Sequence, residues 1–252
     1  MVTLYPAAQK HGHLTQDERP MQCIAHRGGP ANDLPENSLA AITRALSSGC
    51  NAIEIDVWLL HGTLYITHDH RLKQSMGDSC ALWLCSQTQL QSARLSNGET
   101  IPTLQQVLEL VGEQRLLNIE IKNSGCADAV VQALQHWQNT TGGNLEHIVV
   151  SSFNHHELYR LKQQLPTVKL GLLLASNPLD YAAAATALGV FSCNTSLVTT
   201  SAELHADIKR RGLQHWVYTA NHPDEWQYLA AIGVDAVFTD FVDEFLAATT
   251  GV

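Results

Sequence analysis

The groups best suited to chemistry in this sequence are carboxylates that lie in short apolar runs. Glu54 and Asp56 alternate with Ile53 and Ile55, and Glu120 lies in a second apolar run. Because residues two apart in a strand share a face, Glu54 and Asp56 point together and the isoleucines point away. Three converging carboxylates repel one another and are hard to keep ionised without a cation. Oxygen ligands favour a hard cation, so the pattern predicts one divalent ion, Mg²⁺ or Ca²⁺.

Two basic residues accompany the carboxylates and offer a different explanation for them. Lys122 lies two positions after Glu120, on the same expected strand face, and Arg27 follows the apolar run 21–25. Ion pairs of Arg27 and Lys122 with the three acids would form a structural network without a metal. We expect the metal site and keep the ion-pair network as the alternative.

Histidine suits proton transfer near neutral pH, and two of the 13 histidines, His26 and His68, each follow a β run and have distinctive neighbours. His26 precedes an Arg-Gly-Gly turn, and His68 precedes Asp69. Histidines such as His61 and His136 lack such neighbours, and we assign them no function. His26 and His68 are therefore the candidates for general acid and base.

Short runs rich in Ile, Val and Leu alternate with longer segments of helical period, and these elements must position the candidate groups. Strands are expected at 22–25, 52–57, 116–121, 147–151, 168–173, 190–193, 215–219 and 236–238. Helices are expected at 38–48, 104–111, 127–139, 155–164, 180–188, 202–211, 224–232 and 242–248. This strict alternation predicts an α/β fold, a (β/α)₈ TIM barrel, with an open doubly wound sheet as the alternative. Active sites of such barrels form at the carboxyl ends of the strands.

No linker or low-complexity segment divides the chain, so we expect a single catalytic domain over residues 21–252. The polar residues 1–20 precede the first strand and are expected to be an N-terminal extension, with disorder as one option. The stretch 58–100 is longer than one loop requires. We expect an insertion at about 60–100, with an extra strand at 63–67 and the rest over the barrel mouth.

Composition limits the classes of partner. Of the 252 residues, 45% are apolar and 15% charged, as in a globular protein with a sizeable core. The net charge of −9 disfavours nucleic acid as a partner. No run reaches the roughly 18 apolar residues of a membrane span, and residues 1–20 lack the apolar core of a signal peptide. We therefore expect a cytoplasmic protein without stable membrane insertion, and the sequence leaves room for a homodimer.

The six cysteines are scattered through apolar or helical contexts, and we expect them to be reduced and mostly buried. Cys80 and Cys85 could hold a metal, but no second pair matches them, so a zinc site is not expected.

A series of short motifs runs in order along residues 22–245. It comprises His26-Arg27-Gly28-Gly29, Pro35-Glu36-Asn37-Ser38, Glu54-Ile55-Asp56-Val57, His68-Asp69, Ile101-Pro102-Thr103-Leu104, Asn118-Ile119-Glu120-Ile121-Lys122, Ser151-Ser152-Phe153, Tyr218-Thr219-Ala220-Asn221 and Gly233-Val234-Asp235-Ala236-Val237-Phe238-Thr239-Asp240. The set closely resembles the glycerophosphodiester phosphodiesterase family. Each motif is weak alone, but the whole set in this order is specific.

The resemblance implies a (β/α)₈ barrel with a small insertion after the second strand. It also implies metal-dependent hydrolysis of glycerophosphodiesters, small molecules left when phospholipids are deacylated, to sn-glycerol 3-phosphate and an alcohol. By the same resemblance, Glu54, Asp56 and Glu120 are the metal ligands, and His26 and His68 are the general acid/base pair.

The resemblance also implies substrate contacts. Arg27 would contact the phosphate, Glu36 would brace Arg27 or the floor of the site, and Lys122 would neutralise phosphate charge. Tyr218 stands where the family commonly has Trp, and Trp216 lies two residues earlier on the same strand face. An aromatic wall for the substrate and packing in the barrel core are both open for this pair.

Two other functions stay open. A phospholipase of the C or D type acting on intact lipids would need an exposed apolar or basic docking surface. The insertion offers Leu82, Trp83 and Leu84, but a single apolar cluster more often packs down as a lid. A non-catalytic barrel that binds phosphorylated ligands would not need both histidines and all three carboxylates, and this disfavours it.

Overall fold

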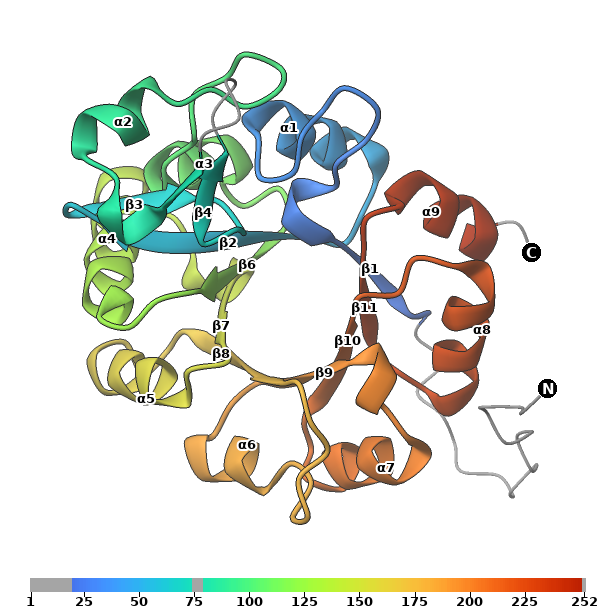
Figure 1. Cartoon of the computed structure of the whole chain (residues 1–252). Coiled ribbons are helices and arrows are strands. Elements are labelled where there is room, and N and C mark those ends of the chain that lie inside the picture. Colours follow the sequence, from blue (N-terminus) through green and yellow to red (C-terminus); the bar gives the residue numbers. More distant parts are fainter. Residues whose placement is uncertain (1–19, 74–78, 251–252) are drawn as a thin grey trace.

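Eight parallel strands form a closed barrel in the computed structural model, which describes residues 20–73 and 79–250 (Figure 1). The barrel strands are β1 (Gln22–Ala25), β2 (Ala52–Leu60), β6 (Leu116–Ile121), β7 (Ile148–Ser152), β8 (Lys169–Leu174), β9 (Ser192–Ser196), β10 (Gln214–Tyr218) and β11 (Ala236–Thr239). Each pairs with the next strand along the chain, and β1 pairs with both β11 and β2, which closes the ring. The predicted (β/α)₈ barrel is confirmed, and the open sheet is excluded.

The helices surround the ring of strands in Figure 1. They are α1 (Leu39–Ser48), α3 (Leu104–Val111), α4 (Cys126–Thr141), α5 (His155–Gln164), α6 (Ala183–Leu188), α7 (Ala202–Arg210), α8 (Pro223–Ile232) and α9 (Val242–Thr250). Alternate strand residues such as Ile53, Ile55 and Val57 are buried in the main core with helix residues such as Ile42 and Val107. The other strand face points into the barrel, and this alternation turns Glu54 and Asp56 inward. Within the described residues, none of the helices has the length and apolarity needed to span a bilayer.

The insertion after β2 contains small elements with a core of their own. These are β3 (Thr63–Ile66), antiparallel to β2, followed by β4 (Arg71–Lys73), β5 (Ser79–Ala81), the 3₁₀ turn η2 (Leu82–Leu84) and α2 (Gln87–Ser92). Its separate core includes Leu60, Leu72, Leu82 and Leu90. The extra strand predicted at 63–67 is confirmed. In Figure 1, the described part of the insertion lies on the β2 side of the ring rather than across its centre, which differs from the predicted cover over the mouth.

The cysteine prediction is wrong at two positions. Cys80 and Cys85 form a disulfide, whereas Cys23, Cys50, Cys126 and Cys193 are buried free thiols, as expected. The pair lies at the end of the β4–β5 hairpin, where the turn η2 brings the two Cα atoms to 6.3 Å. The spacing of the two cysteines in sequence does not by itself reveal this turn, so it does not predict the disulfide.

Candidate active site

Glu54, Asp56 and Glu120 converge at the carboxyl ends of two neighbouring strands. β2 and β6 pair in a register that sets Asp56 opposite Glu120, with Glu54 one inward-facing position earlier on β2. A carboxylate oxygen from each of the three residues lies within 4.8 Å of the others. The structure therefore brings together all three predicted metal ligands.

The electrostatics of this cluster favour a bound cation. Glu54 is only 2% exposed, and its Oε1 atom has no hydrogen-bond partner among the described residues. Burial, followed by the nearby charges of Asp56 and Glu120, raises the pKa of Glu54 well above its ordinary value. Burial also raises the pKa of Glu120, although Lys122 opposes the shift. An unpaired, buried carboxylate oxygen facing two other carboxylates is the donor arrangement that a hard divalent ion fits.

Lys122 neutralises only part of this negative charge. Its Nζ lies 2.6 Å from Glu120 Oε1 and 3.2 Å from Asp56 Oδ1. Burial opposes protonation, but the two carboxylates prevail and raise the pKa of Lys122. The Arg27 side chain pairs with Glu36 instead, while its backbone N–H donates to Glu54 Oε2 at 2.7 Å. Three carboxylates thus face one ammonium, and a divalent ion matches the two remaining charges.

His26 directly follows β1 and is held by a carboxylate that follows the last strand. Its Nδ1 lies 2.8 Å from Oδ1 of Asp240, the residue directly after β11. Asn221 Nδ2 donates to Asp240 Oδ2 at 2.7 Å and fixes that carboxylate. Burial works against ionisation of Asp240, but the hydrogen bond and charge of His26 lower its pKa. When Nδ1 donates to Asp240, Nε2 of His26 is the nitrogen that can exchange a proton.

The backbone after His26 requires the glycines of this segment. Arg27 has φ 50°, and Gly28 follows with φ 80°. A Cβ on Gly28 would lie 2.9 Å from Ile42 Cγ1, so a side chain there would both strain the backbone and collide with α1. This tight 3₁₀ turn, η1 (His26–Gly28), directs the Arg27 amide at Glu54.

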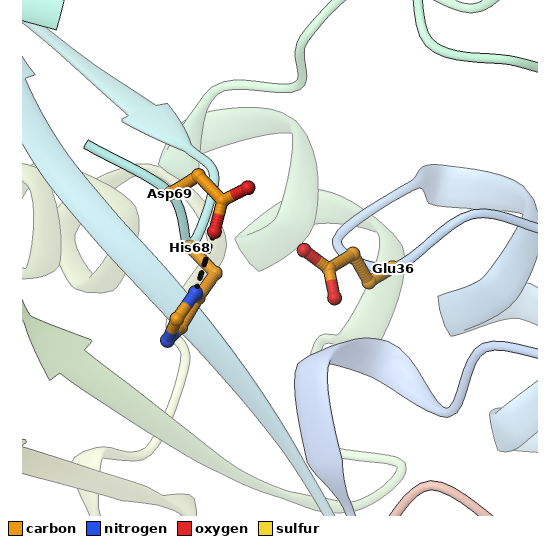
Figure 2. Close-up of side chains that lie close together, drawn as sticks. All are labelled: Glu36, His68 and Asp69. Atoms are coloured by element: carbon orange, nitrogen blue, oxygen red, sulfur yellow. Dashed lines mark hydrogen bonds and ion pairs between the residues drawn. The ribbon is translucent and has the colours of Figure 1, made fainter. Parts of the chain in front are cut away.

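His68 enters from the insertion and meets two carboxylates, as Figure 2 shows. Its Nδ1 lies 3.1 Å from Asp69 Oδ1, and Glu36 turns its carboxylate toward the pair. One ligand-type atom from each of Glu36, His68 and Asp69 lies within 4.8 Å of the others. Glu36 also accepts a 2.7 Å hydrogen bond from Arg27 Nη1, so it links Arg27 to the His68 side of the site.

Tyr218 ends β10, and its side chain is partly buried. Its hydroxyl donates to the Leu174 carbonyl at 2.8 Å, and its ring meets Phe153 edge-on at 5.7 Å. Burial, with a smaller effect of the Glu120 charge, raises the pKa of Tyr218. Trp216 and Tyr218 both pack edge-on against Phe238 inside the barrel, but Trp216 is only 3% exposed. Core packing therefore describes Trp216, whereas Tyr218 combines core packing with a partly exposed side chain.

Sequence reasoning missed two positioning residues. The buried Asn37 donates from Nδ2 to Asp56 Oδ2 at 2.9 Å, and its Oδ1 accepts the Asp56 backbone N–H at 3.2 Å. Asp240 holds His26, as described above. Asn37 lies in the Pro-Glu-Asn-Ser motif, and Asp240 ends the motif at 233–240. The motifs alone do not indicate which side chain either residue contacts. Only the closure of β11 onto β1 brings Asp240, 214 residues away in sequence, to His26.

Comparisons with known proteins agree on one family. The glycerophosphoryl diester phosphodiesterase family model matches residues 26–244. A glycerophosphodiester phosphodiesterase of Bacillus altitudinis is 30% identical and covers 87% of this chain and 94% of its own length. A second, from Caldanaerobacter subterraneus, is 29% identical over 86% of this chain and 93% of its own. Among solved structures, a phosphodiesterase of Oleispira antarctica in complex with the product sn-glycerol-3-phosphate matches with a TM-score of 0.79. It is 26% identical and covers 90% of this chain and 96% of its own.

Proposed function

The chain belongs to the glycerophosphoryl diester phosphodiesterase family, and we propose that it hydrolyses glycerophosphodiesters to sn-glycerol 3-phosphate and an alcohol. The observation that carries this proposal is the inward-facing cluster of Glu54, Asp56 and Glu120 beside two histidines that are each hydrogen-bonded to an aspartate. Three carboxylates would repel an anionic phosphodiester unless a cation is bound between them. The two histidines can transfer protons on opposite sides of the phosphorus atom.

The family generally depends on a divalent metal, and we propose that Glu54, Asp56 and Glu120 hold one such ion, either Mg²⁺ or Ca²⁺. When bound, the ion neutralises phosphate charge and stabilises the charge that develops in the transition state. The orphan Oε1 of Glu54 and the two uncompensated negative charges support this assignment. Asn37 keeps Asp56 oriented for the same task.

His26 and His68 are proposed as the proton-transfer pair. One takes a proton from the attacking hydroxyl, and the other gives a proton to the departing alkoxide. Asp240 and Asp69 each occupy Nδ1 of one histidine, which leaves Nε2 to face the reaction. The pair must begin in opposite protonation states, so the rate should have a bell-shaped pH profile.

The remaining predicted residues surround the phosphate. Arg27 offers a planar set of donors to phosphate oxygens, with Glu36 as its brace. Lys122 adds one positive charge at the cluster, and Tyr218 presents its ring to the glycerol or head group. Such fixed charges and donors commonly provide the largest part of catalysis.

A cytoplasmic location and a homodimer stay predictions, which cell fractionation and light scattering of the purified protein would test.

The test is release of sn-glycerol 3-phosphate from glycerophosphocholine and glycerophosphoethanolamine, with and without a chelator. We expect activity that chelation abolishes and that added Mg²⁺ or Ca²⁺ restores. His26→Ala and His68→Ala should each lose at least about 10²-fold in kcat. His136→Ala, at an exposed position on α4, is the matched control and should keep full activity. Activity after complete metal removal would disprove the metal site, and near-normal turnover of either active-site variant would remove that histidine from the mechanism.

A further inference from the structure

Four polar atoms of neutral side chains are buried inside the barrel without a hydrogen-bond partner among the described residues. They are Asn118 Oδ1, Ser192 Oγ and both terminal atoms of the Asn194 amide, Oδ1 and Nδ2. Asn118 is 1% exposed, and Ser192 and Asn194 are 0% exposed. Since both ends of the Asn194 amide are unpaired, exchanging its oxygen and nitrogen would leave it equally unsatisfied. Buried amides and hydroxyls are costly without a partner, so these atoms indicate a bound ligand.

The unpaired atoms gather around the inward position of Gly171 on β8. Gly171 pairs in register with Ser151 on β7 and with Ser192 on β9. A Cβ on Gly171 would lie 2.8 Å from Asn194 Nδ2, 3.0 Å from Ser192 Oγ and 3.2 Å from the Ser151 Cβ. The Ser151 hydroxyl in turn accepts a 3.0 Å hydrogen bond from Asn118 Nδ2. Asn118, Ser151, Ser192 and Asn194 therefore meet beside one glycine, and we call these four residues the interior polar cluster.

The interior polar cluster is a neighbour of the carboxylate cluster but differs from it in charge. Asn118 precedes Glu120 by two residues on β6, so it takes the next inward position toward the amino end of the strand. Ser151 is the register partner of Glu120 on β7. Trp216, the register partner of Asn194, belongs to an apolar core inside the barrel. The interior polar cluster thus borders the charged site and an apolar core, and all four of its own side chains are neutral.

Gly171 keeps the space beside these side chains open. It lies within β8 and has no positive φ, so its backbone conformation does not require glycine. A side chain at this position would instead enter the interior polar cluster. Glycine inside a strand often marks a place where a ligand approaches closely.

The donors and acceptors of the cluster select the ligand. Asn118 Oδ1 and Asn194 Oδ1 accept hydrogen bonds, Asn194 Nδ2 donates them, and the Ser192 hydroxyl can do either. A metal cation would face the N–H groups of Asn194, and an anion would face the two amide oxygens. Water both donates and accepts, and a buried water usually makes about three hydrogen bonds to otherwise unsatisfied groups.

We propose that the interior polar cluster binds at least one ordered water, which bridges Asn194 to Ser192 and Asn118. The water accepts a hydrogen bond from Asn194 Nδ2 and donates to the unpaired oxygens. It is a permanent part of the barrel interior, next to the site that binds the metal but separate from it.

Ser192→Ala tests the site through the sign of a stability change. In a hydrated cluster the Ser192 hydroxyl bonds to water, so its loss should lower Tm by about 2–4 °C, measured by calorimetry on the metal-loaded full chain. In a dry cluster the same change removes an unsatisfied buried hydroxyl, so Tm should stay the same or rise, and this result would overturn the proposal. Ser47→Ala, at an exposed position on α1, is the control and should not lower Tm.

Gly171→Ala tests the space directly. Its methyl group would lie 2.8 Å from Asn194 Nδ2, so it should displace water. Magnetic relaxation dispersion of ¹⁷O-labelled water counts internal waters with long residence times, and the variant should lose at least one relative to the parent protein. Waters on the bound metal are common to both proteins and cancel in the difference. Equal counts would contradict the proposal, and the Ser192→Ala result stands even if Gly171→Ala fails to fold.

A high-resolution crystal structure identifies the occupant. We expect electron density about 2.7–3.2 Å from Asn194 Nδ2, without anomalous signal when crystals are soaked in Rb⁺ or Br⁻. Anomalous signal at this position would show an ion in place of water and refute the assignment. A cluster without any density would refute it as well.

Discussion

At the scale of single residues, each proposed proton carrier has a carboxylate on Nδ1. The imidazole of His26 is oriented by Asp240, which is itself held by Asn221. This resembles the arrangement in which an acid selects the tautomer of a catalytic histidine and steadies its charged form. Asp240 is therefore a positioning residue whose effect should appear through His26.

Asp240→Asn tests that role. The amide no longer stabilises protonated His26 and can impose the wrong tautomer, so kcat should fall about 10²- to 10⁴-fold with little change in KM. The limb of the pH profile that reports His26 should shift to lower pH, which loss of packing would not cause. Asp243→Asn, an exposed change three residues later, is the control. An unshifted profile would show that Asp240 has only a structural role.

At the scale of elements, β10 and α7 are joined by a pair of histidines outside the active site. His215 is completely buried, with Nδ1 3.0 Å from His205 Nδ1 and Nε2 2.8 Å from Thr195 Oγ1. Burial, His205 and Lys209 lower the pKa of His215 to about 3. Burial also lowers the pKa of His205, although Asp235 opposes this shift.

This pair should make the fold sensitive to acid. Between about pH 6 and pH 4 the unfolded chain protonates His215 while the folded protein does not, so folding stability falls as the pH falls. The slope should approach 1.4 kcal/mol per pH unit for His215 alone, measured as the free energy of unfolding in denaturant. His215→Gln should flatten the slope whatever its effect at pH 7. His136→Gln, at an exposed site, should leave the slope as it is, and equal slopes in all three proteins would refute the explanation.

The insertion is a second element with its own stability. Its small core is closed by the Cys80–Cys85 disulfide, and the Leu82 amide donates to the His70 carbonyl at 2.9 Å. Because His70 lies two residues after His68, the disulfide helps to order the segment that carries this histidine.

Cys80→Ser/Cys85→Ser should therefore loosen the insertion and leave the barrel intact. A short disulfide loop contributes about 2 kcal/mol, so amide exchange in residues 79–92 should become faster while β8 stays protected. Hydrogen exchange read by mass spectrometry measures both regions at once. A reductant should reproduce the effect in the parent protein and add nothing in the double variant. Exchange that accelerates equally in β8 would instead show that the disulfide stabilises the whole fold.

At the scale of the whole molecule, the metal site opposes folding until a cation is bound. The raised pKa of Glu54 means that the folded protein holds a proton which the unfolded chain loses above about pH 4.5. Stability of the metal-free protein should therefore fall as the pH rises from that value through the folded pKa. A divalent ion replaces the proton and removes this penalty.

Saturating Mg²⁺ or Ca²⁺ should raise Tm by about 5–10 °C at pH 8. At pH 5 the rise should be smaller, since protons compete for the same oxygens. Calorimetry with and without chelator measures both values. Glu120→Gln should abolish the rise, whereas Glu244→Gln on the exposed start of α9 should retain it. A rise that is independent of pH, or that survives in Glu120→Gln, would place the ion elsewhere.

The sequence by itself determined the barrel and its chemistry. Alternation of apolar residues in β2 and β6 fixes which side chains face inward, and this local property identified Glu54, Asp56 and Glu120. The order of the motifs then restricted the reaction, because catalytic groups at strand ends recur in a fixed sequence within a family.

The tertiary structure alone decided how these groups are oriented and what surrounds them. Asp240 reaches His26 only because β11 closes onto β1, and Cys80 meets Cys85 only through a turn that the spacing conceals. Likewise, Phe153 meets the Tyr218 ring only because the barrel brings the ends of β7 and β10 to the same mouth. Contacts between segments far apart in sequence depend on closure of the chain, whereas the inward face of a strand depends only on the residues next to it.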